Sequence, residues 1–161
     1  MDNGAIKQKI VCGLQQIAAT AESEKWTSDR TWTIAIKQLL DELGKQYGFR
    51  TCANGCDSSN GSEWLCDFVW LELDQENQII DVPLVVESEW GNTLAVLDDF
   101  QKIVIVNARL KLMIFQPRDL NSTLTTLKNT VLAFRYTRPG DHYLFACWYD
   151  RAWTFETFVV D

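Results

Sequence analysis

Three acidic residues lie towards the ends of two apolar stretches of the chain. Asp67 belongs to the first stretch, and Glu87 and Glu89 belong to the second, residues 79–90. Side chains of a strand alternate between its faces, so Glu87 and Glu89 are expected to point the same way. In an antiparallel hairpin centred on Asn77, Asp67 would stand directly opposite Glu87, with Cβ atoms about 4.5–5.5 Å apart. The sequence therefore predicts three carboxylates on one face of a hairpin.

Such a group of carboxylates needs positive charge nearby. Like charges opposed across two strands destabilise a sheet, and a buried charge without a partner is costly. Hard oxygen ligands favour Mg²⁺ or Mn²⁺, and a cation of this kind can generate a hydroxide nucleophile and stabilise charge on a phosphodiester. The alternative is that the three acids stand at an exposed strand end and are simply solvated.

The elements that would position these acids follow from hydrophobic periodicity. Apolar residues at helical spacing predict helices at residues 4–21, 27–47, 92–106 and 120–134. Stretches rich in β-branched and aromatic residues predict strands at residues 49–53, 64–73, 79–90, 110–116, 143–149 and 153–160. Together these elements predict an α/β fold in which a mixed central β-sheet is flanked by helices.

The order of these features resembles the PD-(D/E)XK nuclease superfamily. Asp67 on one strand, the run Glu87-Ser88-Glu89 on the next, a following helix and a further strand match its pattern. The matching part covers about residues 30–135. The resemblance implies a restriction-endonuclease-like core of order α-β-β-β-α-β. It also implies one domain over residues 1–161, with an N-terminal helix and a C-terminal strand pair added to the core.

The resemblance further implies roles for individual side chains. Asp67 and Glu87 would bind Mg²⁺ or Mn²⁺. Glu89 would also be a metal ligand or would orient water, at a position that is usually a Lys. Lys102 on the following helix would supply positive charge to the phosphate, which makes these four the candidate catalytic residues. Glu42 is the nearest match to a further acid that the superfamily often adds from the preceding helix.

Two of these residues also have ordinary structural interpretations. Lys102 stands four residues after Asp98, so the two could form an exposed ion pair that stabilises the helix by roughly a few tenths of a kcal/mol. Glu42 would then belong to a solvated helix face. The sequence alone leaves both interpretations open.

Charge is distributed unevenly along the chain. The net charge of −7 argues against a general nucleic-acid coat protein. Residues 1–101 hold 7 basic and 17 acidic residues, a net charge of −10. Residues 102–161 hold 8 basic and 5 acidic residues, a net charge of +3, so this part could carry a basic surface. The alternative is an ordinary solvated surface.

Two functions therefore stay open. The first is a metal-dependent nuclease, or a nuclease-related protein, that hydrolyses phosphodiester bonds of DNA; many nucleases on this core act as homodimers. The second is a non-catalytic protein of the same fold that binds a basic protein partner, as an immunity protein or an antitoxin does. The acidic first part of the chain and the missing motif Lys favour the second function.

The sequence also predicts a cytoplasmic protein. No apolar stretch approaches the roughly 20 residues that span a bilayer, and residues 1–4 lack the features of a secretory signal. Five cysteines are an odd number without a regular framework, which favours free thiols in a reducing compartment.

Overall fold

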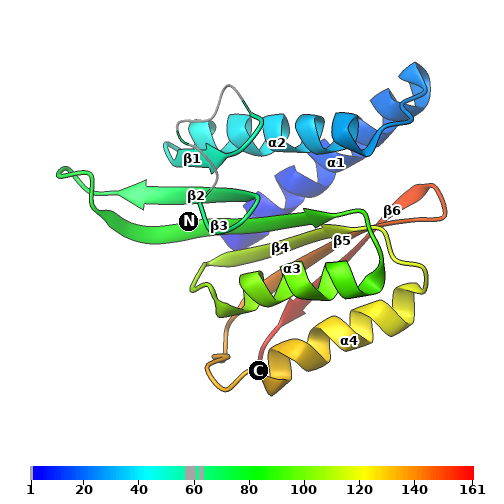
Figure 1. Ribbon diagram of the computed structural model, residues 1–161. Helices are drawn as coiled ribbons and strands as arrows, with labels where there is room; N and C mark the ends of the chain where they lie inside the picture. The colour runs from blue at the N-terminus through cyan, green and yellow to red at the C-terminus, as the bar shows by residue number, and fades with distance from the viewer. Residues whose placement is uncertain (1, 57–60, 62–63) are drawn as a thin grey trace. The chain divides into compact units, whose positions relative to one another are not determined.

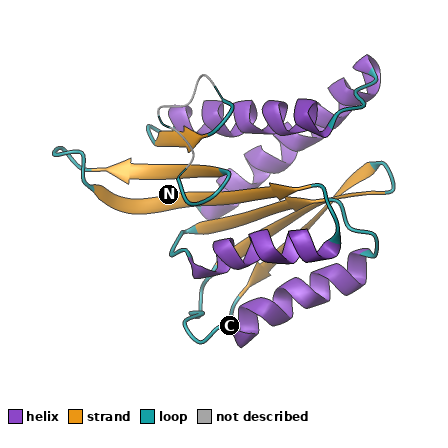
Figure 2. Ribbon diagram, in the orientation of Figure 1, coloured by secondary structure: helices purple, strands orange, loops and turns teal. Residues whose placement is uncertain are grey.

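A computed structural model describes residues 2–56, residue 61 and residues 64–161 of the chain (Figures 1 and 2). The elements follow one another as α1 (Asn3–Glu24), α2 (Asp29–Gln46), β1 (Arg50–Ala53), β2 (Phe68–Leu73), β3 (Ile79–Glu89), α3 (Thr93–Ile105), β4 (Leu110–Phe115), α4 (Leu120–Ala133), β5 (His142–Tyr149) and β6 (Ala152–Val159). None of the helices among these residues is long and apolar enough to cross a membrane.

The strands form a mixed six-stranded sheet of order β1-β2-β3-β4-β5-β6. β1 is antiparallel to β2, the strands β3, β4 and β5 run parallel to one another, and β6 is antiparallel to β5. The predicted α/β fold with a mixed sheet flanked by helices is therefore confirmed. The chain divides into two compact units, residues 1–83 and residues 84–161, and the boundary falls inside β3.

The first unit packs two helices and the β1–β2 pair. Ile6, Ile10 and Leu14 recur at helical spacing along α1 and are buried. The side chain of Asp2 begins this helix by accepting a hydrogen bond from the backbone N of Gly4 at 2.8 Å. Helix α2 carries its own buried apolar stripe and packs against α1 and β1.

A polar network inside the first unit ties α2 to the β1–β2 pair. Asp41 is only 1% exposed and accepts hydrogen bonds from the Thr51 hydroxyl and from Lys45 Nζ. The indole N–H of Trp70 donates to the carbonyl oxygen of Leu40 at 2.9 Å. Because buried polar groups are costly without partners, these bonds fix how the helix meets the strands.

β2, the strand that was predicted to carry Asp67, is shorter than the sequence predicts. The sequence predicts a strand that starts at Trp64, but β2 begins only at Phe68. Leu65 has a φ of 69°, a left-handed conformation that a strand cannot contain, and Cys66 N donates to Trp64 O at 2.8 Å. Asp67 therefore lies in a bend before β2 rather than on the strand.

The turn between β2 and β3 also differs from the expected one. Asp74 N donates to Gln78 O at 3.0 Å, which centres the turn on Glu76 instead of Asn77. The side chain of Asp74 closes the turn by accepting bonds from the backbone N of Glu76 and Gln78 at 2.9 and 2.8 Å. The direct pairing of Asp67 with residue 87, which assumed a centre at Asn77, does not follow from this turn.

The second unit places α3 and α4 side by side against β4 and β5 (Figure 1). Asn92 and Asp119 begin the two helices by accepting backbone hydrogen bonds at 2.9 Å from Leu94 N and Ser122 N. Phe100 on α3 contacts the rings of two aromatic residues of β5, Tyr143 at 6.0 Å and Phe145 at 5.7 Å between ring centroids.

The cysteines give a direct test of this packing. All five are free thiols, of which Cys12 is exposed and the other four are buried. Burial, together with the negative charge of Glu156, raises the pKa of Cys147 to about 12. Because the thiolate is the reactive form, a thiol reagent at pH 8 is expected to label one cysteine rapidly and the other four only after unfolding. A Cys12→Ser variant should lose the rapid phase; two or more rapid equivalents in the wild-type protein would contradict the packing.

Candidate functional site

The structure brings two of the predicted site residues into contact within the second unit. Lys102 lies in the last turn of α3, and its Nζ is 3.4 Å from Oε1 of Glu87 on β3. The same Nζ is 2.6 Å from Oδ1 of Asp99, one turn earlier on the helix. The interpretation of Lys102 as the partner of Asp98 is therefore wrong, because its helical partner is Asp99.

Glu87 owes its position to strand alternation. It lies in register with Met113 of β4, inside the parallel part of the sheet, and is only 1% exposed. The odd-numbered side chains of this part of β3 face the helix that follows, which is how Glu87 meets Lys102. A buried carboxylate without compensating charge is strongly unfavourable, so the Lys102 ammonium stabilises the buried position of Glu87.

The electrostatics of Lys102 follow from the two carboxylates beside it. Its pKa is raised above the usual value, chiefly by the hydrogen bond to Asp99, while partial burial acts in the opposite direction and the charge of Glu87 raises it further. Lys102 therefore stays an ammonium at every working pH. A permanent positive charge next to a buried carboxylate is suited to stabilising negative charge on a substrate.

Glu89 stands two residues further along β3, at the point where the chain turns into α3. Its Oε1 accepts a hydrogen bond from Gly91 N at 2.5 Å. A Cβ at position 91 would come within 2.7 Å of this oxygen, so a larger residue there would push the flexible Glu89 side chain aside. Glu89 is thus held by the strand-to-helix turn and remains partly exposed at the end of the strand.

The other two predicted acids belong to the first unit. Asp67 is partly buried in the bend before β2. Glu42 is exposed on α2, in agreement with the interpretation that it lies on a solvated face. Its neighbour Asp41 is the buried acid of that helix, and it was not predicted. The i,i+4 spacing of Asp41 and Lys45 was the one signal in the sequence that could have drawn attention to it.

The residues of the second unit fit a hard cation by their chemistry. Glu87 and Glu89 offer carboxylate oxygens from one strand, and with Asp99 they outnumber the single positive charge of Lys102. Mg²⁺ and Mn²⁺ prefer such oxygen ligands and tolerate a site completed largely by water. Over residues 2–56, 61 and 64–161, no three or more Asp, Glu, His or Cys side chains are grouped closely enough to hold a metal ion by themselves.

Comparisons of the chain with known proteins gave no match. No protein-family model matches the chain, and neither a curated protein nor a solved structure matches it.

Proposed function

We propose that this chain is a metal-dependent phosphodiesterase of the PD-(D/E)XK type that cleaves DNA, with its chemistry centred on Glu87 and Lys102. The observation that carries the proposal is the 3.4 Å contact between the Lys102 ammonium and the buried Glu87 carboxylate. A nuclease of this type needs an acid that binds the metal and a nearby positive charge for the phosphate. The order α2-β1-β2-β3-α3-β4 is also the one that a restriction-endonuclease-like core would have.

Each side chain has a defined task in this proposal. A bound metal, held by Glu87 and Glu89 and otherwise by water, would lower the pKa of a coordinated water and neutralise charge on the phosphate. The partly exposed Glu89 would accept a proton from the attacking water. Lys102 would place its ammonium against a non-bridging oxygen as negative charge develops there, and its raised pKa keeps that charge in place.

A cleavage assay tests this proposal. Single-stranded DNA, duplex DNA and RNA are incubated with the protein in Mg²⁺, in Mn²⁺ and in EDTA. We expect cleavage of DNA that depends on the divalent ion and that falls by about 10²–10⁴-fold in Glu87→Gln, which keeps the shape of the side chain but removes its charge. Glu76→Gln, at the exposed turn between β2 and β3, should cleave as the wild-type protein does. Equal cleavage by both variants would exclude Glu87 from the chemistry.

One observation favours a second candidate function. The buried Glu87 already has a positive neighbour in Lys102, so its burial does not by itself require a metal. A non-catalytic protein could use the same fold to bind a basic protein, with the acidic residues 1–101 providing the surface. Tight binding to a basic protein, weakened by added salt and indifferent to EDTA, together with no cleavage of any nucleic acid, would favour this candidate.

A further inference from the structure

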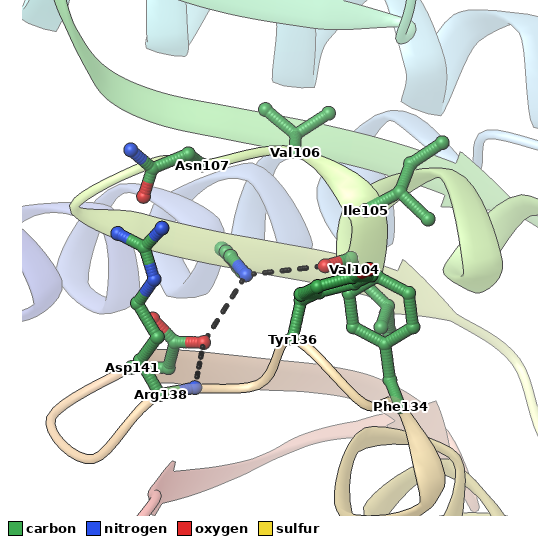
Figure 3. Close-up of a pocket in the computed structure, with 9 residues that line it drawn as sticks. Val104, Ile105, Val106, Asn107, Phe134, Tyr136, Arg138 and Asp141 are labelled. Atoms are coloured by element: carbon green, nitrogen blue, oxygen red, sulfur yellow. Dashed lines mark hydrogen bonds and ion pairs between the residues drawn. The ribbon is translucent and has the colours of Figure 1, made fainter.

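A depression of about 210 Å³ lies in the second unit, away from the carboxyl end of β3 (Figure 3). It is formed where α3 ends, where β4 begins and where the segment after α4 passes over both. Its lining combines two basic side chains, one acid, one amide and several apolar groups.

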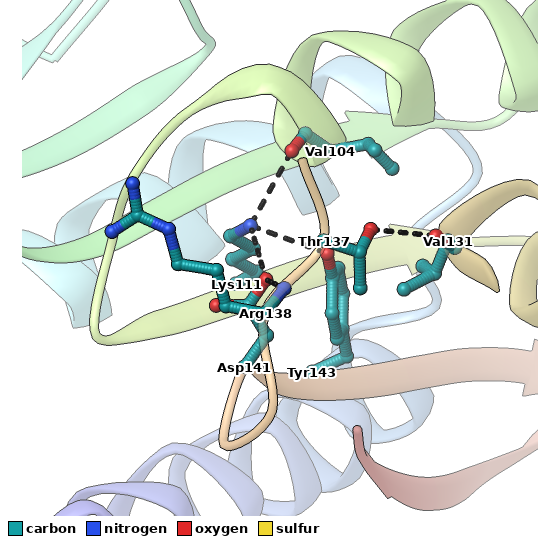
Figure 4. A network of polar contacts seen from close by, with 7 residues as sticks. All are labelled: Val104, Lys111, Val131, Thr137, Arg138, Asp141 and Tyr143. Carbon is teal, nitrogen blue, oxygen red and sulfur yellow. Dashed lines mark hydrogen bonds and ion pairs between the residues drawn. The ribbon is translucent and has the colours of Figure 1, made fainter. Parts of the chain in front are cut away.

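The floor of the depression is a buried lysine held by two hydrogen bonds and an ion pair (Figure 4). Lys111 is 3% exposed, and its Nζ lies 3.4 Å from Val104 O, 3.2 Å from the Tyr143 hydroxyl and 3.6 Å from Asp141 Oδ2. Two hydrogen bonds and one ion pair hold this ammonium in place inside the fold. Lys111 therefore supplies charge to the depression without being the group that contacts a ligand.

Lys111 also engages the carboxylate of Asp141. Asp141 Oδ2 pairs with the Lys111 ammonium and accepts a hydrogen bond from the backbone N of Arg138 at 3.2 Å. The Asp141 carboxylate is thus held between Lys111 and the backbone of the segment after α4. Asp141 is only three residues from Arg138, but its carboxylate pairs with Lys111 instead. In the part of the chain that the structure describes, the guanidinium of Arg138 therefore has no ion-pair partner.

The free guanidinium lies beside a second polar group. Figure 3 shows the Arg138 guanidinium and the Asn107 side chain on the same side of the depression. A guanidinium presents a planar fork of N–H donors, and an amide can add another donor, which together suit a phosphate. The lining holds two basic side chains, Lys111 and Arg138, and one acid, Asp141, so it carries one excess positive charge. The pKa of Lys111 is lowered chiefly by burial, and the positive charge of Arg138 lowers it further.

The opposite wall is apolar and open to solvent. Tyr136 is 72% exposed and touches Phe134 in an edge-to-face arrangement, with centroids 5.8 Å apart and planes at 68°. The large exposed Ile105 stands beside them in the lining. An exposed aromatic ring next to a phosphate-binding fork is an arrangement that suits a nucleotide, because the base can stack while the phosphate is held.

We propose that this depression is a nucleotide-binding subsite, in which Arg138 and Asn107 hold a phosphate and Tyr136 stacks on the base. The choice of a nucleotide rests on the proposed function, whereas the phosphate-binding geometry does not. Ile105 follows Lys102 by three residues, about 4.5 Å along the axis of α3. A DNA strand that leaves the Glu87–Lys102 cluster along this helix would reach the subsite with its next nucleotides.

Calorimetric titrations in EDTA test the subsite separately from cleavage. Thymidine 5′-monophosphate, thymidine and an eight-residue oligothymidylate are each titrated into the full chain. We expect the two phosphate-bearing ligands to bind and thymidine to bind far more weakly. Arg138→Ala should weaken binding by about 10- to 100-fold, and Tyr136→Ala by about 5- to 100-fold. Arg135→Ala, an exposed arginine of the same segment outside the lining, should bind within about twofold of the wild-type protein.

The outcomes answer two separate questions: whether the ligand is a free nucleotide or a strand, and whether the chain is a nuclease. Binding of the monophosphate indicates a site for free nucleotides as well as strands, and binding of the oligonucleotide alone indicates a strand. The titrations contain EDTA and do not depend on cleavage, so nucleotide binding without any cleavage in the Mg²⁺ or Mn²⁺ assay would keep the subsite and reject the nuclease. Unchanged binding in Arg138→Ala, or no binding of either phosphate-bearing ligand to the wild-type protein, would overturn the subsite.

Discussion

Cleavage of DNA by Lys102→Ala is expected to be about 10²–10³-fold slower than cleavage by the wild-type protein, because the variant loses the ammonium that faces the phosphate. Lys102 contacts Glu87 and Asp99, and its pKa is raised, so its charge is present at every pH at which the reaction is measured. The charge itself therefore imposes no loss of rate up to about pH 10. Initial rates on labelled DNA in Mn²⁺ measure the effect.

Loss of stability has to be separated from loss of chemistry in this variant. Removing Lys102 leaves Glu87 buried without its positive neighbour, which destabilises the fold. The double variant Lys102→Ala/Glu87→Gln removes that uncompensated charge, so its thermal stability should recover towards the wild-type value while its cleavage stays lost. Lys128→Ala, which breaks an ion pair with Glu156 on the same unit, is the matched control and should keep the wild-type rate. A Lys102→Ala protein that is folded and fully active would remove Lys102 from the mechanism.

Replacing Gly44 with alanine is expected to lower the free energy of unfolding by about 2–4 kcal/mol. A Cβ at this position of α2 would stand 2.6 Å from the indole nitrogen of Trp70 and 2.6 Å from Cγ2 of Thr51. Both neighbours are fully buried, so they cannot move aside freely. Displacing the indole would also break its hydrogen bond to Leu40 O, and alanine's better helix propensity, about 1 kcal/mol, offsets only part of the loss.

Urea unfolding of two matched variants measures this effect. Gly4→Ala makes the same chemical change in the exposed first turn of α1, where the nearest atom is the end of the Asp2 side chain at 3.1 Å. Its unfolding free energy should stay within about 0.5 kcal/mol of the wild-type value. If Gly44→Ala were as stable as Gly4→Ala, the close approach of α2 to Trp70 would be incorrect.

The elements were predictable where a periodic apolar pattern decides them. The four helices begin and end within three residues of their predicted bounds, because buried residues such as Ile10 and Leu40 repeat at helical spacing. The start of β2 was not predictable, because Trp64, Leu65 and Cys66 are apolar in sequence while Leu65 adopts a left-handed conformation. Nothing in the residue types marks that conformation.

The site was predictable in its residues more than in its contacts. Glu87 and Lys102 were both singled out, and the structure brings them together. The role of Asp99 was missed, because Asp98 and Asp99 are adjacent and only the rotation of the helix decides which of them meets Lys102. Lys111 was missed for another reason: it interrupts an apolar strand, and its burial depends on acceptors from distant segments.

The central claim is that this chain binds a divalent metal ion with its own carboxylates. Calorimetric titration of Mn²⁺ into the wild-type protein and into Glu87→Ala/Glu89→Ala, with and without DNA, tests it most directly. We expect Mn²⁺ to bind the wild-type protein, more tightly when DNA is present, and not to bind the folded double variant. Absence of binding to both proteins, or equal binding to both, would contradict the claim and leave the recognition of a basic protein partner as the function to pursue.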